Sequence, residues 1–405
     1  MGKQSSLGVD VQRRTFRTRF YGSIVILYAR FTFILYLCIE NTKKNNTHNM
    51  QRTKVLLAAI AITLFATPSA KAQLSWDKAF NKFKMEVRAD GEYTTTDTAA
   101  RPNLGFHGKY FNLKLGGDLG SGFSYYFMQR IVANEGSVTF FDNTDFLYLD
   151  YKPTNNWRLR FGKDAMALGG FEYDAAPIDV YFPTNLWRNI YCFQLAFSGA
   201  YITDDGNHTF MAQVSNSPYV NYNNLNYDAG LVSYNLYWAG NMGHWHTLWS
   251  TSMVEYKWNN YLNMIMIGNK LVYDKWDLYV DFIHHALAID DWGKNFGIVS
   301  CANYYFTPQF NIFVKGMYEQ NKSGENLGSS VAMDHQLAAG HTSARYGLGF
   351  EYFPSEQKNV RLHIYGCRMT DSFTDATTNQ PVTVATWNFN VGATWTMDYY
   401  QMFKK

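Results

Sequence analysis

The most restrictive feature of the sequence is a long succession of short segments in which apolar and polar side chains alternate. Between residues 82 and 93, for example, Phe83, Met85 and Val87 alternate with charged side chains. Successive side chains of a β-strand point to opposite faces, so each segment presents one apolar and one ionic face. A soluble sandwich also alternates, but here the polar positions are rich in charges and glycines, and the apolar positions end in aromatic residues. This combination is typical of strands whose outer face touches lipid between two aromatic girdles.

The number of alternating segments predicts how the sheet closes. We place about sixteen of them, each of roughly 10 residues, which is the length that a tilted strand needs to cross a bilayer. An even number of antiparallel strands closes into a ring without a free edge. The sequence therefore predicts an all-β fold, a closed antiparallel transmembrane β-barrel of about sixteen strands. The segments begin at residues 81, 106, 123, 145, 157, 190, 208, 228, 245, 261, 276, 295, 310, 344, 360 and 385.

Composition excludes two other classes of chain. Of the 405 residues, 47% are hydrophobic, 18% are aromatic and only 17% are charged, and the mean hydropathy is −0.29. A bundle of membrane helices needs apolar runs of about 20 residues, which a chain of this average polarity does not supply. Disorder needs low hydrophobicity and high net charge, which the chain also lacks.

Three regions of different character divide the chain. Residues 50–72 are interpreted as a secretory signal peptide, with a basic start, an apolar stretch and a small-x-small cleavage site that ends at Ala72. Residues 1–49 are interpreted as an over-extended and poorly ordered start, because Arg30 interrupts their apolar stretch. A membrane anchor is the alternative for that stretch. Residues 73–405 form the predicted barrel domain.

The formal net charge of +3 belongs to the leader. Residues 1–72 hold eleven of the 36 Lys and Arg and two of the 33 Asp and Glu, so the remaining 333 residues carry 25 basic and 31 acidic side chains, a balance of −6. No nucleic-acid partner is expected from that balance. Three cysteines follow the leader, and an odd, scattered set does not indicate a disulfide framework.

Short and long connections alternate between the predicted strands. Outer-membrane barrels have short periplasmic turns and longer external loops, so the longer connections are expected to be external. The rhythm fails after the ninth segment, near Trp258, which leaves the strand count open by two. The longer connections are residues 94–105, 134–144, 164–189, 216–227, 321–343 and 369–384.

The third external connection, residues 164–189, is the longest and is unusually apolar. It includes Phe171, Tyr181 and Trp187. A long connection in a compact domain is usually functional, and an apolar loop exposed to solvent is a liability. We therefore predict that this loop folds inward and rests on the inner wall of the barrel.

The strand before this loop reads Trp-Arg-Leu-Arg-Phe-Gly-Lys over residues 157–163. Together with the loop that follows, it resembles the corresponding strand and constriction loop of the phosphate-selective porin O and P family. The resemblance implies a sixteen-stranded outer-membrane porin, a homotrimer in contact with membrane lipid and lipopolysaccharide, which passes small hydrophilic solutes or ions, including anions such as phosphate. In that family, phosphate selectivity comes from a ladder of arginines and a cluster of lysines.

The predicted inner face carries both signs of charge. Arg158 and Arg160 lie on the strand that leads into the loop, so we expect a positive wall to face the acids of the loop across the narrowest point. Inward acids such as Asp281 and Glu351 are as numerous as inward bases, which departs from a purely basic ladder. The predicted pore-lining and constriction residues are Lys82, Lys84, Arg88, Arg130, Arg158, Arg160, Lys163, Glu172, Asp174, Asp179, Arg345 and Arg361.

The alternative is a barrel with a structural or enzymatic role and no conducting pore. The suggestive clusters are His284-His285, Asp204-Asp205 and Asp290-Asp291. Adjacent strand residues point to opposite faces, so the two histidines should not converge, and paired acids in turns are ordinary turn formers. No metal-ligand spacing, phosphate-binding glycine loop or cysteine nucleophile motif appears, and we expect no enzyme activity, metal or cofactor. A receptor with a plug domain would need more residues than the chain has before its first strand.

Overall fold

The computed structural model describes residues 76–131, 141, 143–219, 230–286, 293–322, 337, 339–375 and 377–403. The predicted over-extended start, residues 1–49, and the predicted signal peptide, residues 50–72, lie outside the described residues. A compact unit extends over Leu74–Lys405 and contains all the strands given below.

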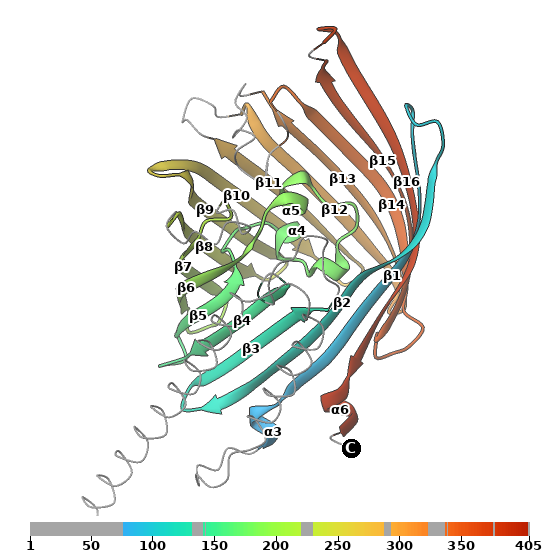
Figure 1. Cartoon of the computed structure of the whole chain (residues 1–405). Helices are drawn as coiled ribbons and strands as arrows, with labels where there is room; N and C mark the ends of the chain where they lie inside the picture. Colours follow the sequence, from blue (N-terminus) through green and yellow to red (C-terminus); the bar gives the residue numbers. More distant parts are fainter. Residues whose placement is uncertain are drawn as a thin grey trace, which may run out of the picture. The chain divides into compact units, whose positions relative to one another are not determined.

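Sixteen antiparallel strands form one closed barrel, in which β16 pairs with β1 (Figure 1). Each strand otherwise pairs with the strands before and after it in sequence. The predicted number of strands and the predicted closed antiparallel arrangement are therefore confirmed. The strands are β1 (Lys82–Thr96), β2 (Asn103–Gly120), β3 (Phe123–Arg130), β4 (Thr144–Tyr151), β5 (Trp157–Ala165), β6 (Phe193–Ile202), β7 (His208–Asn216), β8 (Val232–Met242), β9 (Trp245–Lys257), β10 (Asn260–Val272), β11 (Trp276–Ala286), β12 (Asn295–Thr307), β13 (Phe310–Asn321), β14 (Thr342–Tyr352), β15 (Val360–Thr374) and β16 (Pro381–Asp398).

Five short helical segments accompany the barrel in the described part of the chain. They are α3 (Trp76–Ala79) and α6 (Tyr399–Phe403) beside the first and last strands, and α4 (Phe171–Asp174), η1 (Pro177–Asp179) and α5 (Asn185–Asn189) between β5 and β6. In the described part of the chain, no helix is long and apolar enough to cross a membrane.

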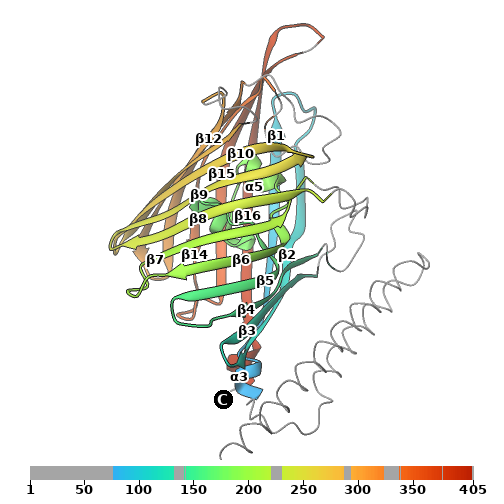
Figure 2. The ribbon, with the colours of Figure 1, turned by 90° about the vertical axis from the view of Figure 1, so that its left-hand side faces the viewer.

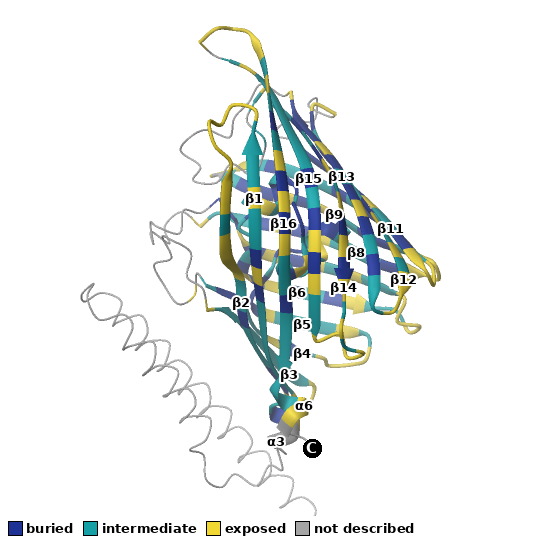
Figure 3. Cartoon of the chain, turned by 90° about the vertical axis from the view of Figure 1, so that its right-hand side faces the viewer, coloured by how far each residue is buried: buried dark blue, intermediate teal, exposed yellow. Residues whose placement is uncertain are grey.

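The two faces of the sheet differ as the alternation predicts. Leu348 and Val391 are exposed on one face, whereas Arg88 and Asp90 are almost completely buried on the other. Figure 3 shows the resulting alternation of exposed and buried positions along β14, β15 and β16. Figure 2 shows β6 to β10 side by side and inclined, as tilted barrel strands are.

The polar face is not polar everywhere, which the sequence pattern did not predict. Met264 and Met266 on β10 and Val299 on β12 share their face, by strand register, with Asp281 of β11, and all three side chains are almost fully buried. The apolar stretch between β5 and β6 packs against this part of the wall, and two apolar surfaces shield each other from water. Local alternation cannot show that an inner wall also has to receive a loop.

Two of the predicted long loops are wrong, because the structure extends strands through them. Residues 94–105 and 369–384 belong largely to hairpins, and β15 pairs with β16 as far as Thr374 and Pro381. Most of the predicted loops at 134–144, 216–227 and 321–343 lies outside the described residues.

Candidate constriction site

The connection between β5 and β6, residues 166–192 and hereafter the constriction loop, is bonded to distant strands. Near its start the Gly169 N–H donates to the Ser250 hydroxyl on β9 at 2.8 Å. The Phe171 and Glu172 N–H groups donate to the two carboxylate oxygens of Asp281 on β11 at 2.9 and 2.8 Å. Asp281 on β11 therefore caps the start of α4, because its carboxylate accepts from N–H groups that the first turn of a helix leaves unpaired.

A pair of glycines allows the constriction loop to approach the wall closely. A Cβ added to Gly268 on β10 would lie 2.8 Å from the Cα of Gly170. Gly170 itself has a φ of 92°, a conformation that side chains with a Cβ rarely adopt. Any larger residue at Gly268 would push the loop away from β10.

The middle of the constriction loop is held by charged residues of β13 and β14. Lys315 forms an ion pair with Glu172 at 2.6 Å and donates to the Tyr181 carbonyl at 2.9 Å. Glu319 accepts from the Asn185 N–H at 3.0 Å. Arg345 donates to the Pro183 carbonyl and, at 2.6 Å, to the Asn185 side chain. The loop thus lies against the polar faces of both strands.

Further anchors come from β14, β15 and β1. Arg88 donates to the carbonyls of Ile178 and Val180 at 3.1 and 3.2 Å. Arg361 forms an ion pair with Asp179 at 2.8 Å and also donates to the Ile178 carbonyl. Both guanidinium groups lie over the ring of Tyr181, whose hydroxyl donates to Glu351 on β14 at 2.7 Å. Figure 1 shows α4 and α5 within the ring of strands that supplies these anchors.

Apolar packing completes the attachment in two clusters. The first joins Met166, Leu168, Leu186 and Ile190 of the loop to β9, β10 and β11. The second joins Tyr181 and Phe182 to the inner positions of β12, β13 and β15. Burying these side chains removes the unfavourable exposure that the sequence composition predicted for the loop.

Two of the three acids predicted to face Arg158 and Arg160 lie elsewhere. Glu172 is buried beside Lys315, and Asp179 pairs with Arg361. Because the loop crosses to β13 and β15, these two acids meet Lys315 and Arg361 there. Ion pairing with these cations neutralises them. Asp174 is exposed and has no ion pair among the described residues.

The basic residues of β5 divide into three cases. Arg160 is bonded to Asp150 at 2.6 Å and to Asp164 at 2.9 Å. Arg158 shares its face and has no ion pair with any described acid. Lys163, predicted to line the constriction, stands five and three positions from Arg158 and Arg160, so its register places it with the opposite face of β5. Its side chain is buried and donates to the Phe141 carbonyl.

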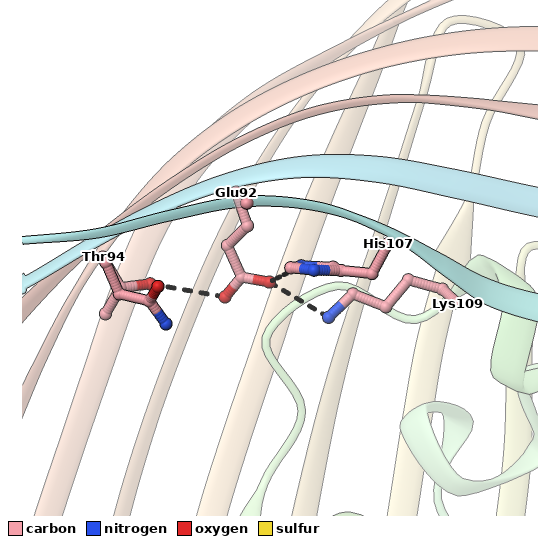
Figure 4. A pocket seen from close by; sticks show the side chains of 6 residues that line it. Glu92, Thr94, His107 and Lys109 are labelled. Carbon is pink, nitrogen blue, oxygen red and sulfur yellow. Dashed lines mark hydrogen bonds and ion pairs between the residues drawn. The ribbon is translucent and has the colours of Figure 1, made fainter.

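The other predicted basic residues are distributed around the wall. Lys84 pairs with Asp398 and Arg130 with Asp145, each at 2.9 Å. Lys82 lies over the ring of Tyr126, 4.6 Å from its centroid. Above the constriction loop toward the β1–β2 hairpin, Glu92 binds both His107 and Lys109, as Figure 4 shows. These groups line one wall but do not converge on one point.

Four contributors to the site were not predicted from the sequence. Lys315 and Tyr181 join wall to loop, Tyr237 on β8 experiences the charges of both Asp174 and Arg158, and Arg188 on α5 is exposed without an ion pair in the described part of the chain. The inward parity of Lys315 was readable from β13. The role of Tyr181 was not readable from the sequence, because its hydrogen-bond partners Glu351 and Lys315 lie more than 130 residues away.

The clusters considered for enzymatic chemistry have other surroundings. His284 and His285 pair with successive residues of β10, Ile265 and Met264, so they occupy alternate faces of β11. In the turn before β7, the Thr203 hydroxyl and the Asn207 amide lower the pKa of Asp205 to about 2, as in a carboxylate that closes a turn. Asp290-Asp291 lies outside the described residues. Within the described ranges, no cluster of His, Cys, Asp and Glu has the arrangement of a metal site.

Three solved structures have a similar fold. The channel DcaP of Acinetobacter baumannii is 12% identical with a TM-score of 0.53, covering 78% of this chain and 96% of that one. OmpF of Salmonella typhi, in complex with daunomycin, is 13% identical with a TM-score of 0.50, covering 77% and 97%. A loop L8 deletion mutant of Vibrio cholerae OmpT is 12% identical with a TM-score of 0.50, covering 78% and 98%. At these identities the similarity shows the fold alone.

Sequence comparison identifies the family. No curated protein sequence matches the chain. A family model described as phosphate-selective porin O and P matches residues 82–382, which is well over half of the chain and spans β1 to the beginning of β16. The resemblance inferred from residues 157–163 and the following loop is thereby confirmed, and the chain belongs to the phosphate-selective porin O and P family.

Proposed function

We propose that the protein is an outer-membrane porin that lets small hydrophilic solutes and ions diffuse passively and that favours anions, with the constriction loop setting the size and charge of its passage. Between Gly169 and Asn185, the loop's hydrogen bonds and ion pairs to strands run to β1, β9, β11, β13, β14 and β15. Across the described residues, β3 to β6 receive none from this part of the loop. The passage is therefore expected between the loop and the wall of β3 to β6.

The observation that supports anion preference is an imbalance of unpaired charges. Glu172 and Asp179 are neutralised by Lys315 and Arg361. Arg158 on the wall has no ion pair in the described structure, and Arg188 on the loop has none either, although Glu319 and Asp371 lie near it. Asp174 is the loop acid that lacks an ion pair among the described residues. Fixed charges in a narrow passage act more strongly than the same charges in bulk water, so this local excess counts for more than the overall balance of −6.

The test is the reversal potential of the purified barrel in planar bilayers that separate unequal KCl concentrations. Replacing Arg158 and Arg188 together by Ala should shift this potential toward cations. Arg101→Ala, on the exposed tip between β1 and β2, is the matched control and should leave the potential unchanged. An unchanged potential in the double variant would contradict the charge assignment, and a folded barrel without conductance would favour the structural alternative.

Phosphate is one anion that the proposal includes. Adding phosphate to a chloride-conducting channel should reduce the chloride current if both anions use the same passage. The Arg158 and Arg188 double variant should show a weaker reduction. An equal reduction in both proteins would place the phosphate contacts at other residues, with the acid-bonded Arg130 and Arg160 of the same wall as the next to be tested.

Export and assembly belong to the same proposal. We infer that a signal peptide is removed after Ala72, so that the mature chain begins at Gln73, and that the barrel forms a homotrimer in contact with membrane lipid and lipopolysaccharide. The cleavage motif and the family membership support this. N-terminal sequencing and native mass spectrometry of the envelope protein test it; a mature chain that begins near Met1 would contradict the cleavage, and a single-chain mass would contradict the trimer.

A further inference from the structure

One arginine faces outward from the barrel, on the side that lipid would touch. Arg368 on β15 pairs in register with Tyr346 of β14 and Trp387 of β16. Both neighbours are exposed on the outer face, at 53% and 40%. Alternation therefore turns the Arg368 side chain away from Cys367, which is buried in the inner cluster with Tyr181.

Arg368 has no acid to neutralise it in the described structure. Its guanidinium carbon lies 5.5 Å from the centroid of the Trp387 ring, so the indole supports the cation from one side. Its Nε is buried and has no hydrogen-bond acceptor within the described ranges. A guanidinium presents five N–H donors in a planar fork that suits carboxylate and phosphate groups, and no protein group in the described part of the chain forms an ion pair with that fork.

The height of Arg368 along the strand coincides with a change in the outer surface. Toward the membrane centre, its outer-face neighbours are Leu348, Ile364 and Phe389, all exposed and apolar. Toward the β15–β16 hairpin, the outer positions of β15 become Thr370 and Ser372. Apolar residues line the hydrocarbon region of a barrel, and aromatic residues mark its interface with the headgroups. Arg368 thus lies at that interface, on the hairpin side.

We propose that Arg368, supported by Trp387 and flanked by Tyr346, binds the phosphate group of a phosphorylated lipid in the outer leaflet of the outer membrane. The inference rests on the proposed placement in a membrane that contains lipopolysaccharide. At the interface, a lipid-facing cation costs about 0–1 kcal/mol, against about 2–4 kcal/mol at the midplane. A phosphate there supplies the anion that the described protein residues do not.

The experiment measures retention of lipid by the purified barrel in detergent. Diphosphorylated lipid A is the probe, and the same lipid A with its phosphates removed is the matched control; native mass spectrometry counts the bound molecules over a concentration series. Wild type should bind the phosphorylated lipid at least roughly tenfold more tightly than Arg368→Gln or Arg368→Met, as expected for loss of a charge-assisted hydrogen bond. Arg368→Lys should keep part of the affinity, and Arg101→Gln should keep all of it.

Heat-modifiable gel mobility first confirms that each variant folds, which is expected because both neutral substitutions remove a charge from the lipid-facing surface. Equal affinity of wild type and Arg368→Gln for phosphorylated lipid A would overturn the proposal. So would a variant that changes the number of associated subunits without added lipid, because Arg368 would then contact a second copy of the chain. Conductance and reversal potential should be unchanged in Arg368→Gln, so a failure here is distinct from a failure of the proposed channel function.

Discussion

Single residues determine how firmly the constriction loop is attached, and Lys315 makes the most concentrated contribution. It is 4% exposed, and it contacts Glu172 and the Tyr181 carbonyl at the same time. A buried charge that loses its partner is strongly unfavourable, whereas a buried pair replaced as a whole is often tolerated. This difference makes the ion pair a useful site for mutation.

Replacing Lys315 by Met should therefore loosen the loop, because the buried Glu172 is left without its cation at a cost of roughly 3–5 kcal/mol. We expect larger and noisier single-channel currents. We also expect the barrel to unfold at a lower temperature, as read from its mobility on a gel after heating. Adding Glu172→Gln to Lys315→Met should recover part of the wild-type behaviour. If the single variant has the currents and the thermal midpoint of the wild type, the attachment of the loop does not depend on this ion pair.

The assignment of faces can also be tested residue by residue. Leu236 on β8 is 59% exposed on the outer face, and Met211 on β7 occupies the inner face at nearly the same height. Leu236→Arg should impair assembly by about 2–4 kcal/mol if it lies near the midplane, because lipid does not solvate the charge. Met211→Arg should be tolerated. Equal yields of folded barrel on a heat-modifiability gel would count against the face assignment.

Among the elements of the fold, the strands were predictable and the destination of the loop was not. Each strand has its own alternating pattern, so β3, β5, β7, β9, β11, β12, β13 and β15 begin at the predicted residues. The loop is held by strands such as β11 and β13, whose side chains lie 109 to 134 residues further along the chain. Only closure of the barrel brings Asp281 and Lys315 beside the loop, which is why the loop acids were first assigned to Arg158 and Arg160.

Deleting part of the loop tests its function as an element. Removal of residues 169–176 takes away the bonds to Ser250 and Asp281 and the Glu172 ion pair. Single-channel conductance should rise, because less of the chain would occupy the passage while the sixteen strands can still pair. If the deleted form assembles and conducts as wild type does, the passage is limited elsewhere.

For the whole molecule, the mixture of charges predicts how selectivity depends on salt. The proposed anion preference comes from a few fixed charges beside water, and the screening length falls from about 10 Å at 0.1 M salt to about 3 Å at 1 M. The reversal potential at a constant concentration ratio should therefore move toward the non-selective value as the mean KCl concentration rises. A preference that does not change over this range would indicate an anion site that is shielded from bulk salt.

The extension of β15 and β16 has a practical consequence on the side of the barrel that is expected to be external. Their ladder continues to Thr374 and Pro381, past the ends of the neighbouring strands at Thr342 and Thr96, and Figure 1 shows this hairpin projecting beyond the other strands. A two-stranded ribbon with its own hydrogen bonds should accept a foreign peptide at its tip without disturbing the barrel. An antibody epitope inserted between Thr377 and Thr378 should therefore be recognised on intact cells, which would make this hairpin a display site.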